Sequence, residues 1–168
     1  FILAGIYGLV VLVSYPGTLC WDTAGQIEQV IGNVGYSARH PLAHTLLVGG
    51  LTKLGYILFS AYEPGLFLYM MVQVVMLAAA LASTIAVLAK RNVKCKWLAG
   101  MLVLYCITPV YTNIVSIAIK DVPYCAFVVG YGVCFALLLE TPGYIRNKKF
   151  VLCFVLMQLG AILFRNNG

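Results

Sequence analysis

The sequence predicts an all-α, polytopic membrane helix bundle with juxtamembrane helices in a long first outer loop. Hydrophobic residues make up 62% of the chain and charged residues only 10%, whereas a soluble domain is about half apolar and a quarter charged. The mean hydropathy of +0.97 agrees with this composition. Long uncharged runs, each able to cross a bilayer, alternate with short basic tracts. We therefore expect the lipid bilayer to be the surroundings of this chain.

The first apolar run, Phe1–Val13, is too short for a full span. We expect residues 1–168 to be a single transmembrane module, a fragment cut inside its first helix. Residues 14–17, Ser-Tyr-Pro-Gly, end that helix, because proline restrains the residue before it and glycine permits a turn. We then predict four further spans, at about 66–89, 97–119, 122–139 and 150–164. Pro109 is expected to kink the second of these.

Residues 14–65 form the longest interruption of the apolar sequence. Asp22 and Thr23 are expected to open a short surface helix, and Thr23 with Gln26 fits the capping-box pattern. Gly32 is expected to help end that helix. Pro41 starts the next helix, in the first-turn position that proline favours. Loops of this length between spans are usually functional or disordered, and the helical patterning here argues against disorder.

The apolar stretch Leu42–Tyr62 has two readings, which differ in the membrane topology they imply. If it crosses the bilayer, the basic tract at 90–96 lies outside and the large loop lies inside. If it lies in the interface, both basic tracts lie in the cytoplasm, as the positive-inside rule favours. The second reading also keeps Lys53 away from the bilayer centre, where it would cost about 3 kcal/mol. We adopt the second reading.

The net charge of +6 reflects topology and does not indicate nucleic-acid binding. Seven of the eleven basic residues lie in the two tracts beside apolar spans: Lys90, Arg91, Lys94, Lys96, Arg146, Lys148 and Lys149. Such clusters mark cytoplasmic loops. The six cysteines show no metal-ligand spacing and are interpreted as packing residues.

This topology gathers ionisable groups on the non-cytoplasmic face: Asp22, Glu28, Arg39, His40, His44, Glu63, Lys120, Asp121 and Arg165. Carboxylates can act as general bases, and arginine, lysine and histidine can hold a phosphate. The mixture fits transfer of a group from a phosphate-linked donor. Purely structural interpretations also stay open. Asp22 would then be a helix cap, Lys120 and Asp121 a surface ion pair, and Arg165 a snorkelling side chain.

Four segments resemble, in order, motifs of the GT-C membrane glycosyltransferases, the superfamily that includes the protein mannosyltransferases. YPG at 15–17 with WDT at 21–23 resembles the acidic motif of the first outer loop. SARHPLAHTLL at 37–47 resembles the proline-started juxtamembrane helix. IKDVP at 119–123 resembles the second acidic motif, and GAILFRNNG at 160–168 resembles the basic end of the fifth helix. Many relatives carry an acidic residue or lysine before the proline, where this chain has Arg39 and His40.

The resemblance implies transfer of a sugar from a polyprenyl- or dolichyl-phosphate donor to a lipid, glycan or protein acceptor. Asp22 would be the general base, and Asp121 would position the acceptor, Lys120 or a metal. The leaving phosphate would be held by Arg39, His40, Lys120 and Arg165. No cofactor is implied with certainty. A divalent metal is one option, with His40, His44 and Asp22 as its candidate ligands. The protein would be integral to the membrane, in the plasma membrane, with its site on the non-cytoplasmic face.

Two other classes of function remain open. A secondary transporter also carries intramembrane charges and kinked helices, but it usually shows inverted repeats and charges at the midplane. Here the charges fall at span ends and no repeat is visible. The third class is a non-catalytic membrane scaffold.

Overall fold

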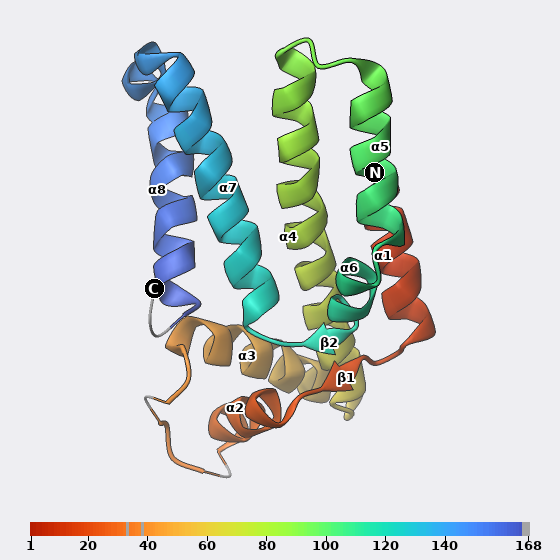
Figure 1. Ribbon diagram of the computed structural model, residues 1–168. Coiled ribbons are helices and arrows are strands. Elements are labelled where there is room, and N and C mark those ends of the chain that lie inside the picture. The colour runs from red at the N-terminus through yellow and green to blue at the C-terminus, as the bar shows by residue number, and fades with distance from the viewer. Residues whose placement is uncertain (33, 38, 166–168) are drawn as a thin grey trace.

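The computed structural model describes residues 1–32, 34–37 and 39–165, and these residues are predominantly α-helical. Figure 1 shows a set of upright helices standing on two helices that lie across their lower end. The upright helices are α1 (Ile2–Val13), α4 (Glu63–Lys90), α5 (Cys95–Ile107), α7 (Asp121–Glu140) and α8 (Lys148–Leu163); the crossing helices are α2 (Trp21–Ile31) and α3 (Leu42–Phe59). The all-α prediction is confirmed.

The upright helices form two groups. Helices α1 and α5 pack beside α4, while α8 packs beside α7, and α4 contacts α7 (Figure 1). The connections at the upper end are the turn after α4 and the short 3₁₀ helix η1 (Pro142–Arg146). Asn147 caps α8, because its side-chain oxygen accepts hydrogen bonds from the backbone N–H groups of Lys149 and Phe150.

Three of the described helices are long and apolar enough to cross a membrane: α3, α4 and α7. Helices α1 and α5 are apolar but shorter. Helix α4 contains the run predicted at 66–89, and α7 contains the one predicted at 122–139. The integral-membrane character expected from the composition therefore agrees with the lengths of these helices.

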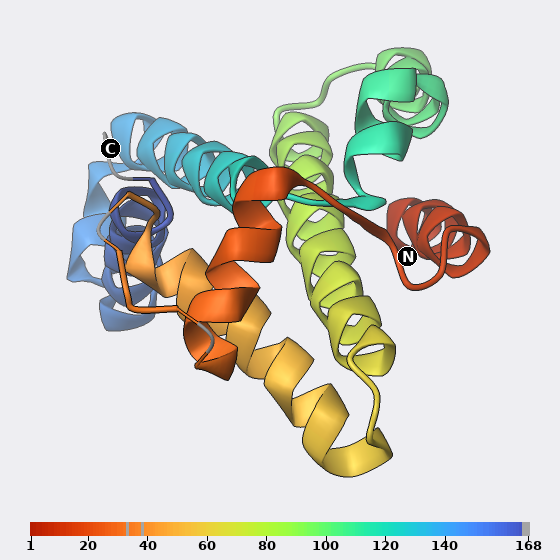
Figure 2. The ribbon, with the colours of Figure 1, turned by 90° about the horizontal axis from the view of Figure 1, so that it is seen from below.

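Helix α3 lies across the bundle although its composition suits a span. Figure 1 shows it lying across the lower ends of α4 and α7, and Figure 2, seen from below, shows α2 crossing it on the side away from them. Its buried side includes Val48 and Thr52, whereas Lys53 is exposed. If α4 and α7 cross a bilayer along their axes, α3 lies along the plane of that bilayer. This is the direction that the interface reading of Leu42–Tyr62 requires.

The run predicted as one kinked helix over 97–119 is interrupted. Helix α5 ends at Ile107, Thr108 is extended, and the short helix α6 (Pro109–Ile114) precedes strand β2 (Ile117–Ala118). The physical reason is Pro109, which has no N–H for the helix and disfavours helical dihedrals at the residue before it. The sequence predicted the position of this break correctly. It predicted a kink within one continuous helix, however, and the structure has two separate helices there.

The start of α2 also differs from the prediction. The helix begins at Trp21 with Cys20 as its N-cap residue, and no side chain caps it. The capping box predicted from Thr23 and Gln26 is therefore wrong, because both side chains have distant partners that are described below. The predicted end is confirmed: Gly32 caps the helix with a positive φ of 96°, a conformation that glycine adopts without steric cost.

The core lies where α1 and α4 meet α6 and β2. Tyr7, Val11, Tyr69, Met70 and Val115 are all fully buried. The Tyr7 hydroxyl donates to the backbone carbonyl of Tyr105 at 2.9 Å, which fastens α1 to α5. This core thus borders β2, the strand that leads into Lys120 and Asp121.

Candidate functional site

A two-residue parallel strand pair brings the two acidic motifs together. Strand β1 (Thr18–Leu19) pairs with β2 in the register Thr18 to Ile117 and Leu19 to Ala118. Because the strands are parallel, both chains leave the pair in the same direction, β1 into α2 and β2 into α7 (Figure 1). The beginnings of these two helices, which carry Asp22 and Asp121, therefore lie at one place.

Two side-chain hydrogen bonds hold this pair of strands. The buried hydroxyl of Thr23 donates to the carbonyl of Ala118 at 2.6 Å. The amide nitrogen of Gln73, from the middle of α4, donates to the carbonyl of Ile117 at 2.9 Å. Buried polar groups are costly unless paired, so these bonds fix where β2 can lie.

Asp22 and Lys120 form an ion pair across 98 positions of sequence. The Lys120 Nζ atom lies 3.5 Å from Asp22 Oδ2, and the two side chains are 29% and 56% exposed. A pair this exposed contributes little to stability, on the order of 0–1 kcal/mol. The pair matters because it places an accessible carboxylate directly beside an ammonium group. Among the ion pairs of the described residues, Lys120 is thus paired with Asp22 and not with its neighbour Asp121.

His44 is the centre of a buried polar network. Its Nδ1 lies 2.7 Å from Gln26 Oε1 on α2, and its Nε2 lies 2.7 Å from the Tyr69 hydroxyl on α4. All three side chains are at most 1% exposed. The Tyr69 hydroxyl also lies 3.3 Å from the carbonyl of Ile119, the residue before Lys120. The network therefore ties α2, α3 and α4 together beside the Asp22–Lys120 pair.

This arrangement changes the role expected for His44. Both ring nitrogens have hydrogen-bond partners, so neither is available to a metal ion. Among residues 1–32, 34–37 and 39–165, no three His, Cys, Asp or Glu side chains are grouped so that they could hold one. The candidate metal set of His40, His44 and Asp22 is not assembled, and His44 is a structural residue.

Arg165 lies at the end of α8, stacked on an aromatic ring of α7. Its guanidinium carbon is 4.8 Å from the centre of the Tyr124 ring, in cation–π geometry. The preceding Phe164 contacts the His44 ring, with 6.2 Å between ring centres. Tyr124 is one helical turn from Asp121, so Arg165 is placed on the same end of α7 as the acidic motif.

Arg39 and His40 lie in the segment that leads into α3. His40 is half-buried, and its Nδ1 is enclosed without a hydrogen-bond partner among the described residues. Arg39 is exposed, and its backbone N–H donates to the Ser37 hydroxyl at 3.2 Å. His40 is thus four residues from His44 along the chain, at the same end of α3. Residues 166–168 of the predicted basic motif lie outside the described residues.

The sequence analysis assigned Gln26 to a capping box and not to His44, and it did not single out Tyr69 or Tyr124. Gln26 is four residues after Asp22 and therefore on nearly the same side of α2, which is a signal that could have found it. Tyr69 and Tyr124 sit inside apolar runs, where an aromatic residue is unremarkable by sequence.

Residues 33–163 match the sequence family described as "Family of unknown function (DUF6020)". The match covers well over half of the chain. The chain belongs to the DUF6020 family. No curated protein and no solved structure matches it. The matched region of this DUF6020 member contains Arg39, His40, His44, Lys120 and Asp121, while Asp22 and Arg165 lie just outside it.

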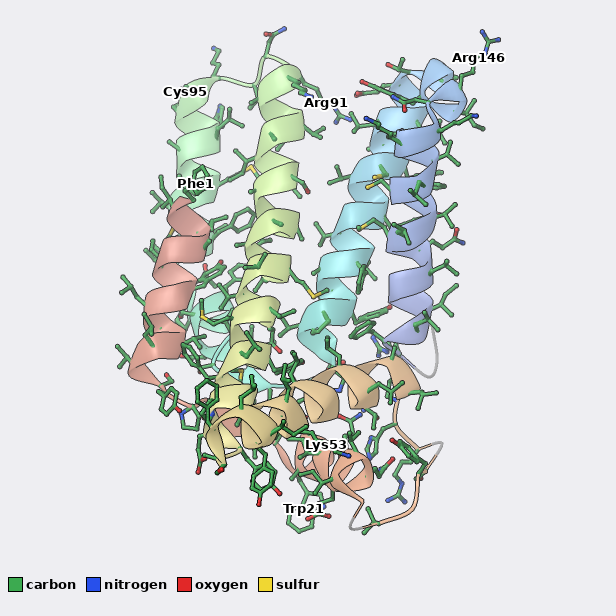
Figure 3. All side chains as sticks on the ribbon, turned by 180° about the vertical axis from the view of Figure 1, so that it is seen from behind. Phe1, Trp21, Lys53, Arg91, Cys95 and Arg146 are labelled. Carbon is green, nitrogen blue, oxygen red and sulfur yellow. The ribbon has the colours of Figure 1, made fainter. Side chains whose placement is uncertain are left out.

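The basic tracts of the DUF6020 chain lie at the other end of the bundle. Figure 3 labels Arg91, Cys95 and Arg146 at the upper end, and Trp21 and Lys53 at the lower end. An ion pair of 2.7 Å between Arg91 and Glu140 joins α4 to α7 at the upper end. We call this upper end the basic end, and the end with the Asp22–Lys120 pair the site end.

Proposed function

We propose that this DUF6020 chain is the module of an integral membrane glycosyltransferase. It moves a sugar from a polyprenyl-phosphate-linked donor to an acceptor on the non-cytoplasmic face. The observation that carries the proposal is the Asp22–Lys120 pair. An accessible carboxylate lies 3.5 Å from an ammonium at one end of a bundle of apolar helices. A base and an anion-binding cation are the two groups that such a transfer needs.

The proposed step is a single displacement. The acceptor oxygen attacks the anomeric carbon of the sugar while Asp22 takes the acceptor proton. The bond between that carbon and the phosphate oxygen breaks, and its electron pair leaves with the lipid phosphate. Lys120, which is paired with Asp22 in the free protein, turns to the phosphate when the donor binds. One displacement inverts the configuration at the anomeric carbon.

The other basic residues of the site end hold the leaving phosphate. Arg165 presents an exposed guanidinium on Tyr124, and guanidinium groups suit phosphate oxygens. His40 and Arg39 approach from the segment before α3. Asp121, exposed at the first turn of α7, orients the acceptor hydroxyl or Lys120. The acceptor is a lipid, a glycan or a protein at the membrane surface.

The test is a transfer assay with the purified protein in liposomes, using a polyprenyl-phosphate sugar with a labelled sugar. Appearance of labelled product together with free polyprenyl phosphate supports the proposal. Uptake of a solute into the liposomes without any product would instead favour a secondary transporter. Neither transfer nor uptake would favour a scaffold.

The orientation of the bundle can be predicted from its two ends. The basic end is expected to face the cytoplasm and the site end to face outward, because basic loops are retained inside. A single cysteine at Val34, in a variant without the native cysteines, should react with a membrane-impermeant maleimide in intact cells. A single cysteine at Asn92 should react only after the membrane is opened. Labelling of both from one side would contradict the shared outer site.

Arg165→Ala is expected to raise the KM for the donor about tenfold or more, since a charge-assisted contact to phosphate contributes about 1.5–3 kcal/mol. The matched control is Tyr124→Phe, which keeps the ring beneath the guanidinium and should leave the KM nearly unchanged. Steady-state kinetics over a donor series measures both. An unchanged KM with less folded protein would show that Arg165 serves only to anchor the helix end.

A further inference from the structure

A pocket lies on the other side of α2 from Asp22. It is an open pocket with a volume of about 380 Å³, lined by residues of α2, of α3 and the start of α4, and of the segment from Pro16 to Leu19. These elements can be followed in Figure 2. Helical geometry separates it from the Asp22 site: Ile31, in its wall, is nine residues after Asp22 and therefore about 180° away around α2.

The pocket combines an apolar wall with two carboxylates. Leu19, Ala24, Ile27 and Leu66 supply apolar surface, while Glu28 and Glu63 are the charged residues among the described part of its lining. Both glutamates are exposed, and neither takes part in an ion pair among residues 1–32, 34–37 and 39–165. By contrast, Asp22 and Glu140 each have a basic partner.

The negative charge of the Glu28 carboxylate is unfavourable at its position in α2. Its carbonyl accepts the closing hydrogen bond of α2 from the Gly32 N–H, so Glu28 lies in the last turn. The negative end of the helix dipole disfavours a carboxylate there. Glu63 adds a second negative charge to the same pocket, although its own position at the start of α4 suits an acid. A cation between the two carboxylates would relieve both effects.

We propose that this pocket binds a small organic amine, with its ammonium group between Glu28 and Glu63 and its apolar body against Ile27 and Leu66. Charge selects the ammonium group, because the lining residues that the structure describes include two carboxylates and no basic side chain. The volume of the pocket limits the apolar part of the amine to roughly the size of one substituted ring. This site is separate from the transfer chemistry and does not depend on it.

The experiment is a calorimetric titration of the purified protein in nonionic detergent with 2-phenylethylamine. The neutral analogue 2-phenylethanol has nearly the same size. Comparing the two ligands on wild-type protein tests the role of the ligand's positive charge without any substitution in the protein. We expect saturable binding of the amine and at least about tenfold weaker binding of the alcohol. Equal binding of both compounds, or no saturable binding of the amine, would overturn the proposal.

Substitutions in the pocket then test whether Glu28 and Glu63 bind the amine. Glu28→Gln and Glu63→Gln change only the charge of exposed side chains, and each should weaken amine binding about fivefold, which is the upper range for an exposed pair. Ala24→Leu should block the pocket without altering charge. Asp22→Asn, on another side of α2, should leave amine binding unchanged, so a failure of the transfer proposal would not affect this result. Unaltered affinity in the double glutamine variant would refute the site.

Discussion

Asp22→Asn is expected to lower the rate of sugar transfer by about 100-fold or more while the protein inserts and melts like wild type. A general base must take a proton, which an amide cannot do, and such bases typically contribute 100-fold or more. The structure removes the main competing explanation, because Asp22 does not cap α2 and no side chain does. The substitution costs at most the exposed pair with Lys120, about 0–1 kcal/mol of stability. Initial rates at saturating donor measure the effect.

Asp121→Asn is the matched control for this experiment. It removes a carboxylate from the start of α7 at the same end of the bundle, and an orienting role predicts a smaller loss than at Asp22. If Asp22→Asn turned over nearly as fast as wild type in well-folded protein, Asp22 would have no part in the mechanism. Asp121 would then be the carboxylate to test as the base.

His44→Ala is expected to lower the free energy of unfolding by about 3 kcal/mol or more. The substitution leaves a cavity and takes a hydrogen-bond partner from two buried groups, Gln26 Oε1 and the Tyr69 hydroxyl, of which the hydroxyl keeps its contact with the carbonyl of Ile119. A buried polar group without its partner costs about 1–3 kcal/mol. Thermal or denaturant unfolding in detergent measures the loss. The network also borders Ile119, so we expect transfer activity to fall in the protein that remains folded.

Leu46→Ala is the control on the same helix. Leu46 is 49% exposed and two positions from His44, so its truncation should change the stability far less. Tyr69→Phe removes only the hydroxyl of the network and should cost about 1–2 kcal/mol. A His44→Ala variant as stable as Leu46→Ala would show that the buried network does not support the fold.

The sequence alone predicted most of the architecture, because the relevant signals are local. Uncharged runs located α4 and α7, Pro109 located the break after α5, and Gly32 located the end of α2. The basic tracts also predicted which segments lie at opposite ends of the bundle, and Figure 3 shows that separation. From this arrangement the sequence placed Asp22 and Lys120 at one end, 98 positions apart.

Only the tertiary structure decided the partners of these side chains. Thr23 and Gln26 match a local capping pattern, yet they bond to Ala118 and His44. His44 resembles a metal ligand four residues after His40, yet Gln26 and Tyr69 occupy both of its nitrogens. The physical reason is that a buried polar group pairs with a complementary group that folding brings near it in space. Those neighbours come from α2, α4 and β2, and sequence spacing carries no information about them.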